Sequence, residues 1–562
     1  MTTGAQFIVE SLIKYHCSRL YVYPGGTIAP ILDEAQSAGL AIFCARHEQG
    51  AGYAALAAAR LSQQPQVVMV TSGPGVTNVL TCVADAYYDS TPLVLIAGQV
   101  GSGDLTAGRP IRQRGFQEVD TPALLKTITK AQFQPTTPAQ LAQVMVDAFT
   151  LATEGRPGPV VIDLPMNVQR NELPSPMSVI PLKIPQTHFD GDLSLLCKWL
   201  AEAQRPLIIA GQGVLQSGAT ALLRRWVKLG VPVSHSLLGI GAICGDDELN
   251  LGFHGHTGFQ AAGVAIQQAD LLLVIGSRLD VRQTGNQFDR FAENARIVRI
   301  DLDKDEVSES RIRHDQLING DVKQVLNALL PMLEAMTLPD WQPWLTEITE
   351  WKQQYAFQPM QNRGLLPQQV IEAADQITAG RALICTTGVG SHQHWVARHF
   401  TFDAPHRRLL TSGGHGAMGY DLPSAVGAQL ANPDALVLCI VGDGSFQMNL
   451  QELAAIQAYR LPVKIIVLDN HRLGLVSQFQ QFNWQSDPTT GEKWNPDFAQ
   501  IAKGFGIESH TITEAAHLQS ILPQALNSPQ AVLLHCQVAI EEDITPMLLA
   551  GQTLDKMWSA HG

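Results

Sequence analysis

The sequence predicts an α/β protein built from three doubly wound domains, each with a parallel sheet, and two observations support this fold class. Short, wholly apolar runs such as 67–70 and 271–275 recur along the chain, and most of them end in Gly or Asp. Runs of about four to eight apolar residues without alternation fit strands buried on both faces of a parallel sheet. The segments between them, such as 47–60, are rich in Ala, Leu, Glu and Gln. The result is a repeated strand–helix order.

Chain length and two linker-like segments indicate the domain boundaries. At roughly 100–200 residues per domain, 562 residues suggest about three domains. Residues 174–186 carry four prolines, and residues 337–362 hold three tryptophans with little periodicity. The final stretch has weak periodicity, so we expect a mobile tail or a lid there. The expected units are a first domain at 1–175, a central domain at 185–335, a third domain at 360–545 and a C-terminal tail at 546–562.

Composition narrows the classes of function and the location. The net charge of −13 gives no global attraction to nucleic acid or to an anionic membrane, although local cations can still hold an anionic substrate. No apolar run approaches the roughly 18–20 residues of a membrane span, and the first residues lack a signal-peptide pattern. The eight cysteines form no C-x-x-C pair and most lie in apolar runs. We therefore expect reduced thiols and a cytoplasmic protein.

Polar residues follow two predicted strands late in the chain. The segment 442–445, Gly-Asp-Gly-Ser, comes directly after the apolar run 436–441, and Asn470 follows the next run, 464–468. Ligands of parallel α/β sheets bind at the carboxyl ends of the strands, where glycines and a helix start accommodate an anion. Asp443 offers a carboxylate oxygen and Asn470 an amide oxygen. With a backbone carbonyl, two phosphate oxygens and a water, they would complete an octahedral Mg²⁺ site.

This segment resembles a known family. Gly-Asp-Gly followed one strand later by Asn is the signature of thiamine diphosphate enzymes, and 442–453 is similar to the large subunit of acetohydroxyacid (acetolactate) synthase. The resemblance covers nearly the whole chain. It implies a carboligase that decarboxylates pyruvate, or a similar 2-oxoacid, and joins the acyl unit to a second 2-oxoacid. It also implies thiamine diphosphate and Mg²⁺, with the metal held by the side chains of Asp443 and Asn470 and by the backbone oxygen of Arg472.

The same resemblance assigns further residues to the cofactor. Met418 falls where the family has a bulky apolar residue that holds the two cofactor rings at an angle, although without the family it would be a core residue. His392 and Gln393 would reach the diphosphate, whereas His392 alone could be a structural loop histidine. The full set comprises Val389, Gly390, Ser391, His392, Gln393, Gly416, Met418, Gly442, Gly444, Ser445, Gly474, Leu475 and Val476, with Pro24, Thr71 and Asn78 in the first domain.

A glutamate opens a predicted helix of the first domain in the stretch Arg-His-Glu-Gln. By position alone, Glu48 would be a favourable partner of the helix dipole. In the family, the matching glutamate bonds to the aminopyrimidine ring and so activates the cofactor, and we assign Glu48 this role. Because the family takes this glutamate and the metal site from different subunits, the resemblance implies a homodimer or homotetramer. It also leaves room for a small regulatory subunit.

The remaining catalytic candidates are expected around the substrate. Gly25 and Gly26 leave space beside the thiazolium ring. Phe116 and Gln117 match the family's Phe-Gln-Glu, whose first two members approach the substrate. Arg282 lies in a stretch similar to the family's Asp-Asp-Arg-Val-Thr-Gly and suits bidentate binding of an acceptor carboxylate, with a surface salt bridge as the alternative.

The central domain has the pattern of a nucleotide-binding domain, which in the family holds FAD without a redox role. Polar and small residues follow its predicted strands, as at ribose and phosphate sites. Residues 255–258 read Gly-His-Thr-Gly where the family has Gly-Met-His-Gly. We expect FAD, with an empty or ADP-binding domain as the alternative. The candidate contacts are Gly211, Gly213, Arg278 and Asp301.

Three departures from the family leave the acceptor substrate open. Met166 replaces a lysine, and Phe479 replaces a tryptophan that favours 2-oxobutyrate. The loop 109–114 carries three arginines near the expected pocket mouth. It is either a solvated charged loop or a receptor for a larger or more anionic substrate. The alternatives to a synthase are therefore a related decarboxylase, an oxidase, a carboligase with a non-pyruvate acceptor, and a non-enzymatic relative.

Overall fold

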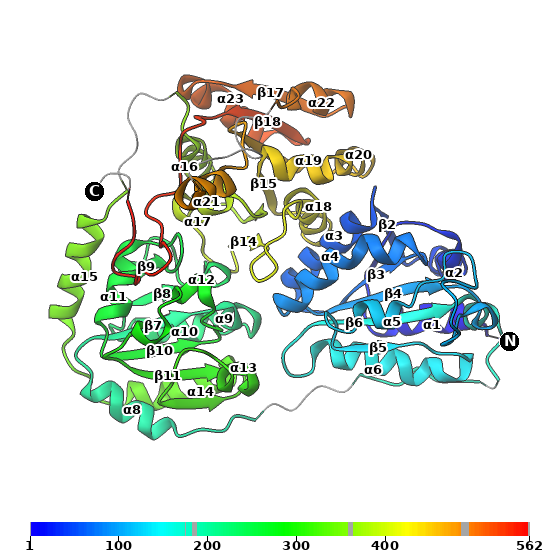
Figure 1. Cartoon of the computed structure of the whole chain (residues 1–562), viewed down its shortest axis with the longest axis horizontal. Helices are drawn as coiled ribbons and strands as arrows, with labels where there is room; N and C mark the ends of the chain where they lie inside the picture. The colour runs from blue at the N-terminus through cyan, green and yellow to red at the C-terminus, as the bar shows by residue number, and fades with distance from the viewer. Residues whose placement is uncertain (1, 175, 183–187, 358–363, 485–493, 560–562) are drawn as a thin grey trace.

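The computed structural model describes residues 2–174, 176–182, 188–357, 364–484 and 494–559. It contains three six-stranded sheets covered by helices, and every paired strand within them runs parallel (Figure 1). The predicted fold class is therefore confirmed. The expected domain limits at 175, 185 and 360 and the last three residues of the expected tail lie outside the described residues.

The first sheet has the order β2-β1-β3-β4-β6-β5. Strands β4 and β6 are buried along their whole length, which explains the apolar runs 93–97 and 159–162 within them. The strands are β1 (Arg19–Val22), β2 (Ala41–Cys44), β3 (Gln66–Val70), β4 (Leu93–Gln99), β5 (Ala131–Phe133) and β6 (Pro159–Pro165). The helices are α1 (Gly4–Lys14), α2 (Ala29–Ser37), α3 (Glu48–Ser62), α4 (Pro74–Tyr88), α5 (Thr121–Leu125), α6 (Leu141–Thr153) and α7 (Met166–Arg170).

The central sheet has the order β12-β11-β10-β7-β8-β9. Its strands are β7 (Pro206–Ala210), β8 (Val233–His235), β9 (Asn250–Phe253), β10 (Leu271–Ile275), β11 (Arg296–Asp301) and β12 (Gln316–Asn319). Its helices are α8 (Leu193–Glu202), α9 (Gln212–Gln216), α10 (Thr220–Val227), α11 (Gln260–Gln268), α12 (Val281–Thr284), α13 (Lys304–Ser308) and α14 (Val322–Glu334).

The third sheet has the order β14-β13-β15-β16-β18-β17. Its strands are β13 (Leu383–Thr387), β14 (Arg407–Thr411), β15 (Leu436–Gly442), β16 (Lys464–Asp469), β17 (Glu508–Ile512) and β18 (Val532–Gln537). Its helices are α16 (Pro367–Ile377), α17 (Ser391–His399), α18 (Asp421–Ala431), α19 (Asp443–Asn449), α20 (Leu453–Ala458), α21 (Gly474–Trp484), α22 (Phe498–Gly504) and α23 (Ala515–Asn527).

Two segments without strong sequence periodicity are packed in the structure. The stretch read as a second linker contains α15 (Gln342–Gln354), and the indoles of Trp341 and Trp344 donate to backbone oxygens of the central domain at 2.9 and 3.0 Å. The C-terminal segment crosses to the central domain, where Leu548 donates its N–H to the backbone oxygen of His256 at 2.7 Å. Leu548 and Leu554 join the apolar core of that domain. Residues 546–559 therefore form a packed strap.

The first and third domains share an apolar core through α3 and α18 (Figure 1). Gly427 allows the close approach, because a Cβ there would lie 2.0 Å from the backbone oxygen of Ala54. All eight cysteines are free and six are buried. Within the described part of the chain, every helix is too short or too polar to cross a membrane.

Candidate active site

A cavity of about 80 Å³ lies at the carboxyl ends of β15 and β16. These strands are neighbours, so Asp443 and Asn470 follow adjacent strand ends. Helices α17, α19 and α21 all begin at its wall, and their free N–H groups and dipoles favour an anion. Of the predicted residues, the wall contains Val389, Gly390, Ser391, His392, Met418, Gly442, Asp443, Gly444, Ser445, Asn470, Arg472, Gly474, Leu475 and Val476.

The oxygen atoms in this cavity suit a hard cation. Asp443 and Asn470 are buried, and Asp443 accepts hydrogen bonds from the N–H of Gly444 at 2.8 Å and from Asn495 at 2.6 Å. Gly474 is required for the tight fit, since a Cβ there would lie 2.6 Å from Oγ of Ser391. The described residues contain no group of three or more His, Cys, Asp or Glu side chains arranged for a metal. A metal here would need one carboxylate, an amide oxygen, a backbone oxygen and phosphate oxygens, which is a ligand set typical of Mg²⁺.

Asp421 organises the loops around this cavity, and the sequence did not reveal it. It is buried at the start of α18 and accepts hydrogen bonds from the N–H of Gly388, from Oγ of Ser445 and, at 3.0 Å, from Nε2 of His392. Gln393 turns the other way, since its amide donates to Oγ1 of Thr411 at 2.7 Å. Asp421 follows the end of the matched motif, where an acid in the first helical turn looks like an ordinary dipole partner.

Glu48 occupies the first position of α3 and is 5% exposed. Its Oε2 accepts a hydrogen bond from Nδ2 of Asn78 at 3.0 Å, while His47 caps the helix by accepting the N–H of Gln49 at 3.1 Å. Oε1 of Glu48 makes no hydrogen bond with any residue that the structure describes. This oxygen is therefore available to a ligand.

The other first-domain candidates lie at the same edge of the sheet. A Cβ on Gly25 would lie 2.3 Å from Cβ of Thr71, whereas a Cβ on Gly26 would meet open space. Gln117 has a positive φ of 64° and contacts Gly73 in the turn before α4. Phe116 is 85% exposed, and Pro24 is exposed as well. Gly25 thus permits close packing of two strand ends, and Gly26 leaves room for a ligand.

The two groups of residues do not line a common cavity. The wall of the 80 Å³ cavity is formed only by residues between 389 and 476. The start of α3 instead meets the 3₁₀ helix η6 (Leu450–Glu452): Glu452 accepts the N–H of Arg46 at 2.9 Å, and Asn449 donates to Oε1 of Gln49 at 2.9 Å. Within one chain, Glu48 therefore does not line the Asp443–Asn470 cavity.

A second cavity of about 690 Å³ lies where the three domains meet. This volume is within the range of small-molecule sites. Burial raises the pKa of Asp301 and lowers the pKa of His256 to about 4, so this imidazole is neutral at pH 7. Thr257, in the altered 255–258 stretch, bonds to Nδ1 of His394 at 2.7 Å. The wall includes the predicted residues Gly213, Arg278, Asp301, Arg282, Gln393, Gly416 and Val389.

Gly211 is not on this wall. A Cβ at this position would lie 2.1 Å from the backbone oxygen of Gly276, so Gly211 allows two strand-end turns of the central sheet to touch. Arg282 is exposed on the cavity wall, and Val389 lines both cavities. Arg282 therefore lines the larger cavity, whose wall shares Val389 with the smaller one.

Comparison with known proteins shows the family of the chain. Residues 2–124, 193–329 and 388–536 match the N-terminal TPP binding domain, the central domain and the C-terminal TPP binding domain of thiamine pyrophosphate enzymes. The chain is 36% identical to the acetolactate synthase isozyme 2 large subunit of Escherichia coli (strain K12), over 99% of both chains. The chain belongs to the thiamine pyrophosphate enzyme family. This thiamine pyrophosphate enzyme has both cofactor-binding domains, since Glu48 lies in the first match and the 80 Å³ cavity in the last.

Two further relatives carry the same description. The acetolactate synthase large subunit of Pyropia yezoensis is 35% identical, over 99% of this chain and 95% of its own. The chloroplastic acetolactate synthase of Arabidopsis thaliana is 36% identical, over 98% of this chain and 84% of its own. Identities of 35–36% establish the family of this thiamine pyrophosphate enzyme. Its reaction has to be inferred from its own site residues.

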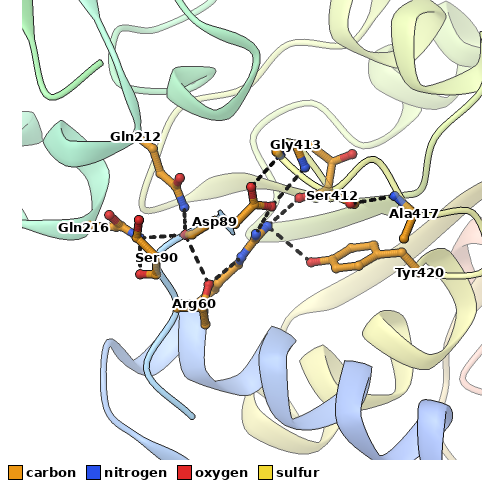
Figure 2. Close-up of polar contacts among 12 residues, drawn as sticks. Arg60, Asp89, Ser90, Gln212, Gln216, Ser412, Gly413, Ala417 and Tyr420 are labelled. Carbon is orange, nitrogen blue, oxygen red and sulfur yellow. Dashed lines mark hydrogen bonds and ion pairs between the residues drawn. The ribbon is translucent and has the colours of Figure 1, made fainter. Parts of the chain in front are cut away.

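One buried carboxylate ties the domains of this thiamine pyrophosphate enzyme together, and the sequence did not predict it. Asp89 pairs with Arg60 and accepts the N–H groups of Gly413 and Gly414 at 2.9 and 2.6 Å (Figure 2). Its backbone oxygen accepts the amide of Gln212 at 3.0 Å. We call Asp89 and these partners the Asp89 cluster. The cluster holds the loop before Met418 against the first and central domains.

Proposed function

We propose that the protein is a carboligase of the acetolactate synthase type. It decarboxylates pyruvate or a similar 2-oxoacid and joins the acyl unit to a second 2-oxoacid. The observation that carries this proposal is Arg282, an exposed guanidinium on the wall of the cavity that also contains Gly416 and Val389. An acceptor that keeps its carboxylate needs a fixed cation, and arginine binds carboxylates through two parallel hydrogen bonds.

The chain's own residues fit the two halves of the cofactor. When bound, thiamine diphosphate accepts the electron pair that a 2-oxoacid releases as it loses CO₂. Asn78 fixes Oε2 of Glu48, so Oε1 can hold or release a proton at the pyrimidine ring. Asp443, Asn470 and the backbone oxygen of Arg472 would hold Mg²⁺, and the starts of α17, α19 and α21 would bind the diphosphate.

We further propose that a second copy of the chain completes the site, giving a homodimer or homotetramer. Glu48 is not on the wall of the 80 Å³ cavity of its own chain. Large side chains near both are exposed, namely Phe116 at 85%, Val476 at 44% and Phe479 at 50%. Such side chains are typical of a surface that is covered in an assembly.

The 690 Å³ cavity is proposed to hold FAD without a redox role. Its volume, Gly213 at a strand-end turn, Arg278 and the buried Asp301 fit a nucleotide. His256 on its wall marks the part of the cavity where this chain departs from the family stretch. Absorbance of the purified protein between 350 and 500 nm would report a bound flavin, and no such absorbance would leave an empty or ADP-binding domain as the alternative.

Product analysis tests the proposed reaction. The protein is incubated with thiamine diphosphate, Mg²⁺ and pairs of 2-oxoacids, and products are identified by mass spectrometry. A 2-hydroxy-2-alkyl-3-oxoacid is expected when pyruvate is present. Acetaldehyde as the sole organic product would identify a decarboxylase, and oxygen-dependent peroxide would identify an oxidase; either result contradicts the proposal.

A further inference from the structure

The loop between β4 and α5 carries three arginines close together. Arg109, Arg112 and Arg114 all lie within residues 109–114, a stretch without Asp or Glu, whereas the acids of the loop lie nearer its ends and the whole chain carries a net charge of −13. All three arginines are exposed. Three like charges within six residues create a local positive potential that attracts anions.

A single carboxylate shapes this loop without neutralising its arginines. Glu118 accepts hydrogen bonds from the N–H of Thr106, from Oγ1 of Thr106 at 2.7 Å and from the N–H of Arg114 at 2.8 Å. Burial raises the pKa of Glu118, but these hydrogen bonds outweigh burial and lower it. The carboxylate is thus ionised, and its hydrogen bonds go to Thr106 and to the loop backbone.

The three guanidinium groups differ in their contacts. Arg109 donates to the backbone oxygens of Leu105 and Thr106 at 3.2 and 3.0 Å, which turns it onto its own loop. The guanidinium groups of Arg112 and Arg114 have no hydrogen bond or ion pair with any residue of the described ranges. Their forks of N–H donors are therefore free for a ligand.

Both ends of the loop are fixed at the edge of the sheet that carries Glu48. Gln99, the last residue of β4, donates to the backbone oxygen of Val119 at 2.8 Å. Gln117 contacts Gly73, the residue before α4, and α4 carries Asn78 to the carboxylate of Glu48. The loop is therefore built onto the turn that supports the proposed active site.

We propose that Arg112 and Arg114 bind a second anionic group of the acceptor substrate, remote from the carbon that reacts. The acceptor class is then a 2-oxoacid that also carries a phosphate, a diphosphate or a second carboxylate. This inference rests on the proposed carboligase function. Pyruvate has a single charge, which Arg282 would hold, so it leaves the loop arginines without a partner. Arginine forks match both phosphate and carboxylate oxygens.

Paired acceptors test the inference on the holoenzyme with pyruvate as the fixed donor. One pair is 2-oxobutyrate and 2-oxoglutarate, and the other is hydroxypyruvate and 3-phosphohydroxypyruvate, so the two arms separate a second carboxylate from a phosphate. The readout is the ratio of kcat/KM for the member with the additional anionic group to that for the member without it. We expect a ratio of at least about ten in one arm, falling roughly tenfold per arginine in Arg112→Gln and Arg114→Gln. It should also fall with added salt.

Arg290→Gln is the matched control, because Arg290 is an exposed arginine of the central domain. It should leave the ratio unchanged. Thermal unfolding should show that the loop variants fold, since Glu118 holds the loop by its backbone and by Thr106. A ratio near one in both arms, or a ratio that both loop variants leave intact, overturns this inference alone. Failure to form a carbon–carbon product with any acceptor would overturn the proposed function and the inference with it.

Discussion

Glu452 accepts a hydrogen bond from the backbone N–H of Arg46 at 2.9 Å, across 406 positions of sequence. The contact joins η6 of the third domain to the start of the helix that carries Glu48. Oε2 of Glu452 is buried and has no hydrogen-bond partner among the residues that the structure describes, and Gly50 lies directly against Oε1. The position of Glu48 therefore depends on a carboxylate from a different domain.

Gly50→Ala should destabilise the protein even though alanine favours helices. A Cβ at this position would lie 2.2 Å from Oε1 of Glu452, which is buried and cannot retreat freely. We expect the free energy of unfolding to fall by about 1–3 kcal/mol, measured by urea denaturation. In the control Gly504→Ala, in α22, the new Cβ would meet open space, so stability should stay equal or rise by up to about 1 kcal/mol. Equal effects at the two sites would contradict the contact.

Glu452 should also make stability depend on pH. Burial raises its pKa from 4.5 to about 7. Because the folded pKa lies above the unfolded value, the native state binds the proton more tightly, and stability falls as pH rises from about 4.5 to about 7. The loss is on the order of 3 kcal/mol. Glu452→Gln, compared with wild type in urea at pH 5 and pH 8, should lack this decrease. Parallel pH curves for the two proteins would refute the assignment.

Glu48→Gln should abolish most of the activity while leaving the fold intact. The amide cannot exchange a proton at the pyrimidine ring, and general acid–base catalysis contributes about 10²–10⁴-fold to rates. Product formation by mass spectrometry measures the loss. Glu10→Gln, an exposed glutamate paired with Lys14 on α1, serves as control and should keep full activity. Undiminished activity of Glu48→Gln would favour a different role for this helix.

Removal of the metal should weaken cofactor binding through Asp443. A ligand that binds only the native state at about 100 times its Kd adds about 2.7 kcal/mol of stability. Thiamine diphosphate with Mg²⁺ should therefore raise the Tm of the wild type, and EDTA should reverse the rise. Asp443→Ala should show little rise under the same conditions. A normal rise in this variant would place the metal elsewhere.

Asp89→Asn should be strongly destabilising. It removes the charge that faces the buried Arg60, whose side chain is 7% exposed, and breaking a buried ion pair costs about 3–5 kcal/mol. It also turns an amide toward the N–H of Gly413 or Gly414. Chemical denaturation measures the effect, and Asp434→Asn, an exposed aspartate, should stay within about 0.5 kcal/mol of wild type. A loss this small for Asp89→Asn would show that the Asp89 cluster adds little.

The predictable parts of the molecule are those with local signals. Strands such as β4 are buried on both faces and so appear as unbroken apolar runs. Asp443 and Asn470 follow adjacent strand ends, and the order and spacing of the apolar runs are enough to predict that the two residues lie close together. The role of Glu48 came from family resemblance, because a glutamate at a helix start looks ordinary by itself.

The features that the sequence did not predict depend on contacts between residues far apart in the chain. Asp89 bonds to residues as far away as Gly414, a separation of 325 positions, and no motif surrounds it. Trp344 looked like linker sequence because the helix around it has little apolar periodicity, yet its indole bonds to the backbone of Pro206. The strap that ends the chain is held by single apolar residues such as Leu554, which give no pattern.

The Asp89 cluster has a consequence for how this chain can change over evolutionary time. Its members come from all three domains, and each satisfies a polar group that another domain buries. A domain exchanged by recombination with a relative would leave Arg60, Asp89 or the Gly413–Gly414 turn facing a foreign partner. In viable hybrids of this enzyme, the residues of the Asp89 cluster should therefore all come from the same parent, although they lie in three domains.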